Sequence, residues 1–173
     1  MIRSFNGKTP KIAESAFISE AAYIVGDVEV GENSSVWPGA VIRGDFGKIK
    51  IGKDTAVEDN CVIHAGSPSG IVNVVIGDNV VIGHGAVSNC HKIGNNTLIG
   101  MNSTILHDAE IGDGCVIAAG CLVKQGMKIP DSKLVAGVPG KIKGEASAEQ
   151  SWWTQNNPNV YPKLAKQYKE QGL

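Results

Sequence analysis

The stretch IGDNVVIGHGAVSNCHKIGNNTLIGMNSTILHDAEIGDGCV, residues 76–116, repeats a six-residue pattern. Each repeat opens with an aliphatic residue that is usually followed by glycine, and a small residue often stands four positions later. Earlier copies such as VGENSS, residues 30–35, extend the pattern toward the amino terminus. A fixed short period over most of a chain indicates a repeat architecture in which each repeat is one structural unit.

The composition of one repeat suits a short buried strand followed by a tight turn, because branched residues favour strands and glycine favours turns. Three such strands close one triangular coil, and each strand pairs with the strand one coil above at ~4.8 Å. Strand starts from Ile18 to Val123 predict about six coils. The sequence therefore predicts an all-β fold, a parallel β-helix.

The six-residue spacing is interrupted in three places. The intervals 42–51 and 63–76 are too long, and the interval 88–93 is one residue short. Insertions in solenoids become loops at corners, often on the functional face. The segments GDFGK (44–48) and AGSPSGIVN (65–73) are therefore predicted to be corner loops.

The repeats end near Val138, which predicts a β-helix domain over residues 1–144 and a tail over residues 145–173. Leu164, Tyr168 and the charged residues between them predict an amphipathic helix after Pro162. The aromatic residues of the tail are predicted to pack it on a β-helix, that of its own chain or of a neighbour; they are Trp152, Trp153 and Tyr161.

The composition of the chain excludes some classes of partner. The chain has 173 residues and a net charge of −1, so no basic excess indicates a nucleic-acid partner. No apolar run reaches the ~18 residues of a membrane span, so no membrane partner is expected. The amino-terminal segment MIRSFNGKTPKIAES lacks an apolar signal core, and a cytoplasmic location is the expectation.

The cysteines divide into two groups. Cys61, Cys115 and Cys121 occupy the small inward position of their repeats, where a free cysteine packs as a compact hydrophobe. Cys90 lies outside that position and is more open to a role in a site. No CxxC spacing is present, so a thiolate zinc site is not expected.

The repeat phase predicts a column of polar side chains. Arg43, His64 and Asn89 each follow a strand start on the same face, so they stack one coil apart and point the same way. His84 falls on a different face and would reach this column only in a neighbouring subunit. A threefold trimer would bring the two together, and closed symmetry would create three shared sites. Neutral imidazoles suit zinc or ferrous iron, and a site with three ligands leaves a position for water.

The chain resembles the γ-class carbonic anhydrases over nearly its whole length. The segments that carry the resemblance are VWPGAVIRGD (36–45), VEDNCVIH (57–64), IGHGAV (82–87), AGVPGK (136–141) and NNPNVYPKLAKQY (156–168). The resemblance implies a left-handed β-helix and a homotrimer with sites shared between neighbouring subunits. It also implies a bound Zn²⁺ or Fe²⁺ and the reversible hydration of carbon dioxide to bicarbonate by a metal-bound hydroxide.

The resemblance assigns roles residue by residue. His64 and His84 match the first two metal ligands, whereas Asn89 stands where the family has its third histidine, so that either Asn89 or His91 would complete the metal shell. Arg43 and Asp45 would hold the interface and the anion end of the substrate. Glu58, where the family commonly has glutamine, or Tyr161 would orient the nucleophile, and His107 or a surface group would carry protons.

Two other functions are compatible with the same fold. One is a hexapeptide acyltransferase, in which an interface histidine deprotonates the acceptor and acyl-CoA lies between β-helices. The segment AGVPGK is shared with those enzymes and does not discriminate. The other is a catalytically degenerate trimer that serves as a scaffold or metal-binding protein, which the Asn89 substitution favours.

Overall fold

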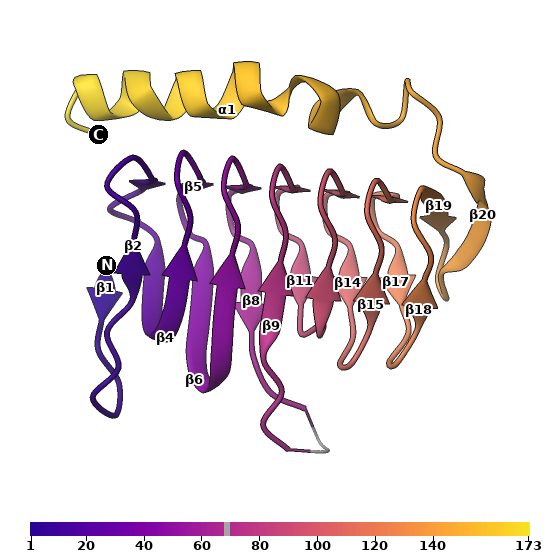
Figure 1. Ribbon diagram of the computed structural model, residues 1–173, viewed down its shortest axis with the longest axis horizontal. Helices are drawn as coiled ribbons and strands as arrows, with labels where there is room; N and C mark the ends of the chain where they lie inside the picture. The colour runs from indigo at the N-terminus through magenta and orange to yellow at the C-terminus, as the bar shows by residue number, and fades with distance from the viewer. Residues whose placement is uncertain (68–69) are drawn as a thin grey trace.

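The computed structural model describes residues 1–67 and 70–173, so Pro68 and Ser69 of the second insertion lie outside the described residues. The chain forms a left-handed parallel β-helix with one carboxy-terminal α-helix, as predicted. Figure 1 shows the coils side by side along the long axis, with the helix lying over one side of them.

The strands form two hydrogen-bonded sheets. The 8-stranded sheet contains β3 (Phe17–Ile18), β5 (Ser35–Val36), β7 (Ala56–Val57), β10 (Val81–Ile82), β13 (Leu98–Ile99), β16 (Val116–Ile117), β19 (Lys133–Ala136) and β20 (Lys141–Glu145). The 12-stranded sheet contains β1 (Ile2–Arg3), β2 (Lys11–Ile12), β4 (Tyr23–Val30), β6 (Val41–Ile51), β8 (Val62–His64), β9 (Val74–Ile76), β11 (Val87–Ser88), β12 (Lys92–Ile93), β14 (Thr104–Ile105), β15 (Glu110–Ile111), β17 (Leu122–Val123) and β18 (Lys128–Ile129).

The 12-stranded sheet covers two faces of the β-helix because β4 and β6 continue around a corner. The first part of β6 pairs with β8, and its last part pairs with β9. The predicted loop at 44–48 is therefore wrong, since those residues lie inside one strand. Glycine permits this bend: a Cβ on Gly44 would lie 2.6 Å from the carbonyl oxygen of Asp27 on the neighbouring strand.

The β-helix has about seven turns rather than the predicted six or so. The additional pairing lies at the two ends. At the amino terminus β1 and β2 both pair in parallel with β4. At the other end β18 pairs with β15, and β19 pairs with β16. These end strands carry weaker copies of the repeat, so the count of clear strand starts stops short of them.

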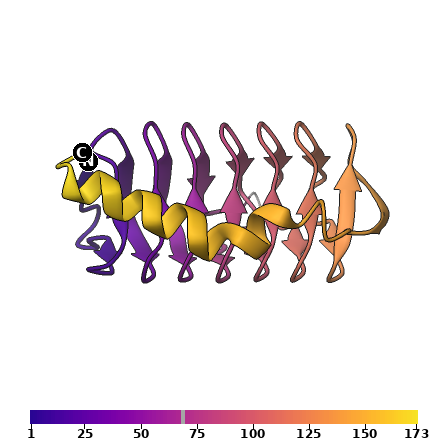
Figure 2. The ribbon, with the colours of Figure 1, turned by 90° about the horizontal axis from the view of Figure 1, so that it is seen from above.

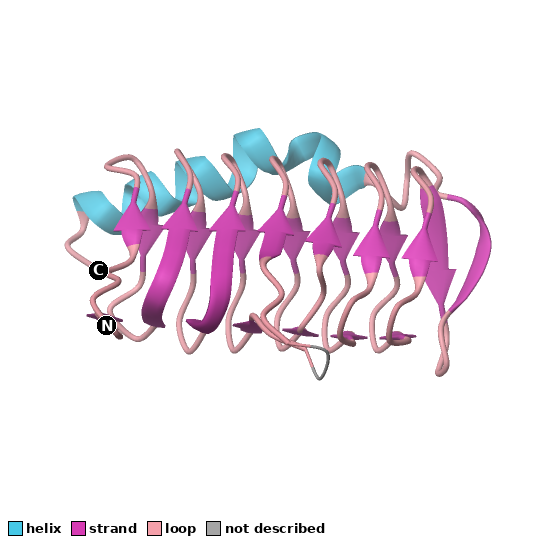
Figure 3. Ribbon diagram, turned by 60° about the horizontal axis from the view of Figure 1, so that its bottom comes forward, coloured by secondary structure: helices cyan, strands magenta, loops and turns pink. Residues whose placement is uncertain are grey.

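The core is built from the inward residue of each short strand. Ile82, Ile99 and Ile117 pair in register on successive coils and are almost completely buried. Adjacent residues of a strand point to opposite sides, so each two-residue strand supplies one core side chain and one outward side chain. This alternation gives every coil outward side chains on each face, and Figure 3 shows the strands of successive coils stacked in rows.

The carboxy-terminal helix α1 (Trp152–Glu170) lies across the 8-stranded sheet, where it contacts β3, β5 and β10 (Figure 2). The prediction that a helix starts after Pro162 is wrong, because α1 begins at Trp152 and contains both Pro158 and Pro162. A proline inside a helix leaves the carbonyl four residues earlier without its usual donor. For Pro158 that carbonyl belongs to Thr154, and the side chain of Asn79 donates to it at 2.9 Å. A tertiary hydrogen bond thus compensates for the proline.

Packing of α1 on the β-helix depends on one predicted residue, Tyr161, and on residues that were not predicted. Tyr161 and Tyr168 pack against the buried pair Phe17 and Trp37. The buried Asn157 donates to the carbonyl oxygen of Asp54 at 2.6 Å and to the side chain of Asn79 at 2.9 Å. The prediction holds for Tyr161 on its own chain, whereas Trp152 and Trp153 stay 49% and 45% exposed in the single chain, so that their packing on a neighbour's β-helix stays a prediction.

The four cysteines are free and buried. For Cys61, Cys115 and Cys121 this confirms the predicted packing role. The prediction that Cys90 is more open to a site role is wrong, because Cys90 is fully buried in the core. Ser88 and Cys90 both turn inward, while Asn89 between them stays partly exposed, as alternation in an extended segment requires.

Over residues 1–67 and 70–173, no helix combines the length and the apolar character that a membrane crossing requires.

Candidate functional site

Arg43, His64 and Asn89 lie in one column on successive coils. Arg43 pairs directly with His64 between β6 and β8. The pairing of β8 with β11 places Ser88 beside Ile63, and therefore Asn89 next to His64. The amide nitrogen of Asn89 lies 3.2 Å from Nδ1 of His64. The repeat thus brings together three side chains that are far apart in the sequence.

Asp45 connects Arg43 and His64, the first two residues of this column. Its two carboxylate oxygens contact Nη1 of Arg43 at 2.6 Å and Nε2 of His64 at 3.1 Å. Burial opposes ionisation of Asp45, but the hydrogen bonds from Arg43 and His64 outweigh it and hold the pKa of this carboxyl below its usual value. An ionised Asp45 accepts a hydrogen bond from Nε2 of His64 and so leaves the lone pair of His64 on Nδ1, where it accepts a hydrogen bond from the amide nitrogen of Asn89.

His84 lies in a second cluster, at the corner that follows β10. Its Nε2 is 3.1 Å from Glu58, and its Nδ1 is 3.0 Å from Asp59. The backbone nitrogen of His84 also donates to Glu58 at 2.9 Å. Tyr161, which comes from α1, donates its hydroxyl hydrogen to the other oxygen of the Glu58 carboxylate.

Glu58 is the buried centre of this second cluster, with only 5% of its surface exposed. Burial raises the pKa of Glu58, although the nearby His84 partly counteracts this. Three donors from two separate elements converge on one carboxylate, so the corner of the β-helix and helix α1 are tied together here. Glu58, His84 and Tyr161 were each predicted as site residues from the sequence, but the contacts between them were not predicted.

The remaining candidates lie elsewhere. His91 is exposed, and its Nδ1 lies 3.0 Å from the backbone carbonyl oxygen of Asn73. This hydrogen bond directs His91 to the corner before β9 and not to His64. Cys90 is fully buried in the core and faces away from the column, and this burial raises the pKa of its thiol to about 11. His107 lies at another corner, where its backbone accepts a hydrogen bond from Gly126.

The donors for a metal ion are divided between the two clusters. Within the described residues of one subunit, no three His, Cys, Asp or Glu side chains are placed to hold a metal ion. One subunit nevertheless contains Nδ1 of His64, which accepts a hydrogen bond from the amide nitrogen of Asn89 here, and the amide oxygen of Asn89; both would hold an ion only after the amide turns over and releases Nδ1. An imidazole and an amide oxygen are acceptable ligands for zinc or ferrous iron. The donor chemistry fits such an ion when a neighbouring subunit adds His84.

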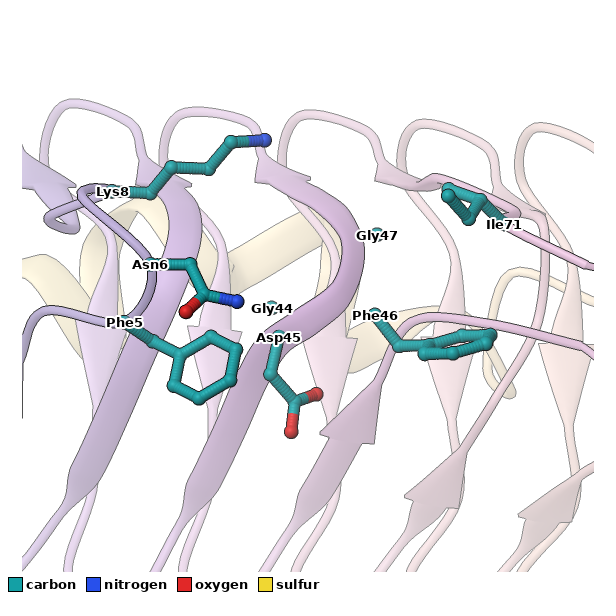
Figure 4. A pocket seen from close by; sticks show the side chains of 8 residues that line it. All are labelled: Phe5, Asn6, Lys8, Gly44, Asp45, Phe46, Gly47 and Ile71. Atoms are coloured by element: carbon teal, nitrogen blue, oxygen red, sulfur yellow. The ribbon is translucent and has the colours of Figure 1, made fainter.

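A shallow pocket of about 250 Å³ opens beside Asp45. In Figure 4, Phe5 and Asn6 extend into it from the amino-terminal hairpin, and Phe46 extends toward the side where Ile71 lies. Phe46 and Ile71 are 53% and 79% exposed. The lining of this pocket therefore combines the apolar Phe5, Phe46 and Ile71 with the polar Asn6 and Lys8.

Two larger pockets meet at the second cluster. One, of about 400 Å³, runs along the 8-stranded sheet, and the other, of about 330 Å³, lies against the aromatic side of α1. Both are lined by Glu58, His84, Trp153 and Tyr161. These pockets were not predicted from the sequence, because the helix was expected to begin after Pro162. Trp153 forms a wall of both pockets only because α1 begins at Trp152.

Two family models match the chain. The bacterial transferase hexapeptide model (six repeats) matches residues 9–44 and 91–125, and the hexapeptide repeat of succinyl-transferase matches residues 54–87. Among solved structures, that of a "putative acetyltransferase" from Bacillus cereus superposes with a TM-score of 0.92 and 41% identity, covering 99% of this chain and 98% of that one.

Several curated relatives carry the name carbonic anhydrase. The "Probable carbonic anhydrase" of Methanocaldococcus jannaschii is 45% identical over 156 residues, which cover 89% of this chain and 95% of the relative. "Gamma carbonic anhydrase 3, mitochondrial" of Arabidopsis thaliana is 43% identical over 75 residues, 42% of this chain and 29% of the relative. With several such relatives, the chain aligns over only about a third of their length or less. The full-length match, together with the repeats, shows that this chain belongs to the γ-class carbonic anhydrase-like family of hexapeptide-repeat proteins.

Proposed function

We propose that the protein is a γ-carbonic anhydrase-like metalloprotein that interconverts carbon dioxide and bicarbonate at sites between the subunits of a homotrimer. The observation that carries this proposal is the contact of Asp45 with His64. It leaves the lone pair of His64 on Nδ1, beside the amide of Asn89. A carboxylate that orients a histidine in this way is the usual outer partner of a metal-binding imidazole.

His64 and Asn89 of one subunit, with His84 of a neighbouring subunit, would hold the ion. When bound, zinc or ferrous iron lowers the pKa of a coordinated water to ~7 and so supplies a nucleophile at neutral pH. Asn89 is a weaker donor than the histidine of the family, so the affinity for metal is expected to be lower than with three imidazoles.

The chain's own residues supply orientation and charge. Asp45 holds the ring of His64 in one tautomer, and Arg43 holds Asp45 by a salt bridge of 2.6 Å. The guanidinium of Arg43 also places a positive charge next to the column, where the bicarbonate anion would be stabilised. Glu58 holds the corner that bears His84 through the backbone nitrogen of His84, and Tyr161 completes the hydrogen bonds of Glu58.

The test is metal content and assembly in matched variants. Zinc and ferrous iron would be measured per chain after anaerobic equilibration, and mass would be measured by analytical ultracentrifugation. We expect a trimer that retains metal, loss of metal in His84→Ala, and at least tenfold tighter binding in Asn89→His. His91→Ala is the matched control and should retain the metal of the unmodified protein. Unchanged metal content in His84→Ala would exclude a shared site of this kind.

Acyl transfer is a second candidate, favoured by the close structural similarity to the Bacillus cereus protein. His84, flanked by carboxylates and next to an apolar pocket, has the surroundings of a general base. Calorimetric titration with acetyl-CoA discriminates between the two functions. Binding that survives chelation of metal and is lost in His84→Ala would support transfer, and failure to bind would exclude it. If the protein binds neither metal nor acetyl-CoA, the remaining alternative is a catalytically degenerate trimer that serves as a scaffold.

A further inference from the structure

The pocket of about 400 Å³ has an elongated apolar floor. Its floor residues are the outward side chains of four successive strands in register: Val81 pairs with Leu98, Leu98 with Val116, and Val116 with Leu134. With ~4.8 Å between rungs, the floor is about 14 Å long. Met101 and Trp153 form walls. This shape fits an extended alkyl chain that lies parallel to the axis of the β-helix.

The charged residues of this groove lie together at its β10 end, where His84 follows Val81 and Ile82 in the chain; Gln150 is a further polar residue of the lining. Glu58, His84 and Tyr161 line that end, and the adjoining pocket of about 330 Å³ adds Asp59 and the indole of Trp37. Within the residues that line the two pockets, the acidic and basic side chains are Glu58, Asp59 and His84, with no lysine or arginine among them. The end of the groove therefore carries two carboxylates against one imidazole.

Aromatic rings surround the same end. Trp153 and Tyr161 lie with their ring centroids 6.2 Å apart, and Trp37 lies 6.2 Å from Tyr161 on the other side. Faces of tryptophan and tyrosine attract cations, most strongly when carboxylates are also near. An organic ammonium group would be stabilised here, whereas a carboxylate would meet like charge.

We propose that this groove binds a small alkylamine, with the alkyl chain on the floor formed by Val81, Leu98, Val116 and Leu134 and the ammonium group between Asp59, Glu58 and the aromatic rings. The proposal goes beyond the proposed hydration of carbon dioxide and does not rest on it. The contacts that it needs all lie within one subunit. Binding therefore does not require a bound metal ion.

The test uses four small probes and isothermal titration calorimetry on the full chain in the presence of a chelator. Octylamine, octanol and octanoate share one chain length and differ in the charge of the head group, and butylamine shortens the chain. We expect octylamine to bind at least tenfold more tightly than octanoate. Because each buried methylene contributes about fourfold to affinity, butylamine should bind at least tenfold more weakly than octylamine.

Three variants locate the binding. Val116→Gln should weaken octylamine at least tenfold, whereas Val75→Gln, an outward valine on β9 that is 42% exposed, is the matched control and should leave binding unchanged. Asp59→Asn should remove most of the preference for octylamine over octanol and leave octanol binding in place. Circular dichroism would verify that each variant is folded.

Several results would overturn the proposal. They are octanoate binding as tightly as octylamine, equal weakening by Val116→Gln and Val75→Gln, or no saturable binding of octylamine to the unmodified protein. Metal content, measured separately, tests the hydration function alone, so failure of one proposal does not imply failure of the other.

Discussion

The hydrogen bond between Tyr161 and Glu58 joins helix α1 to the β-helix, and its strength can be isolated. Glu58 is 5% exposed, so its carboxylate depends on protein donors. A hydrogen bond to a charged group contributes about 1.5–3 kcal/mol to stability. When a buried acceptor loses its donor, the folded state also bears the cost of an unsatisfied buried polar group. We therefore expect Tyr161→Phe to lower the free energy of unfolding by about 2 kcal/mol, since only the hydroxyl is removed.

A double-mutant cycle with Glu58→Gln separates this contact from other effects of each substitution. The expected coupling energy between the two positions is about 1–2 kcal/mol. Urea unfolding followed by circular dichroism, at one fixed protein concentration, gives the four free energies that the cycle needs. The concentration is fixed because any assembly of subunits would itself add to stability.

Tyr168→Phe is the matched control for this cycle. Tyr168 lies on the same helix and packs on the same aromatic cluster, but its hydroxyl has no hydrogen-bond partner within the described residues. Its removal should cost less than about 0.5 kcal/mol. Equal stability of the two tyrosine variants would show that the Tyr161–Glu58 hydrogen bond does not stabilise the protein. A coupling energy between Tyr161 and Glu58 below about 0.5 kcal/mol would show the same.

Three further outcomes are expected. Asn157→Ala should cost about 2 kcal/mol in urea unfolding, because it removes two hydrogen bonds that hold α1; a cost near zero would contradict this. Burial raises the pKa of Cys61 from 9.0 to about 12, so stability should be intact below pH 9 and fall as pH rises toward 12. From pH 8 to 10.5 the unmodified protein should lose about 2 kcal/mol more than Cys61→Ala, and equal losses would refute it. Gly31→Ala should lower the melting temperature more than Gly126→Ala, because its Cβ would lie 2.5 Å from a carbonyl oxygen of Gly52, whereas Gly126→Ala adds only the backbone strain of a φ of +66°; a smaller shift for Gly31→Ala would contradict the clash.

The parts of the fold that follow the six-residue period were predictable from the sequence. Arg43, His64 and Asn89 fall at one phase of the repeat, and parallel pairing in register has no freedom to separate them. Position within the period also separates His84 from this column. The repeat therefore predicts which side chains share a face, because that depends only on counting residues along a regular structure.

Contacts between the tail and the β-helix were not predictable in this way. The early start of α1 depends on Asn79, which donates to the carbonyl that Pro158 leaves without a helical partner. Local rules for proline argue against a helix there, and only a residue far away in the sequence reverses them. The convergence of Tyr161 on Glu58, and the groove walled by Trp153, follow from that start and were missed with it. The continuous strand β6 was missed for a related reason, since insertions ordinarily become loops.

His84 links the two proposals, and this link leads to one more prediction. In the single subunit His84 directs its ring nitrogens to Glu58 and Asp59. If it turns to a metal ion in a neighbouring subunit, both carboxylates lose that partner and become freer to hold an ammonium group. Thermodynamic linkage then requires zinc to tighten octylamine binding and octylamine to tighten zinc binding by the same factor. We expect a factor of about five or more in calorimetric titrations with and without zinc, and none in His84→Ala. An unchanged affinity for octylamine in zinc-loaded protein would show that His84 keeps its carboxylate partners, and the metal would then have to be held without it.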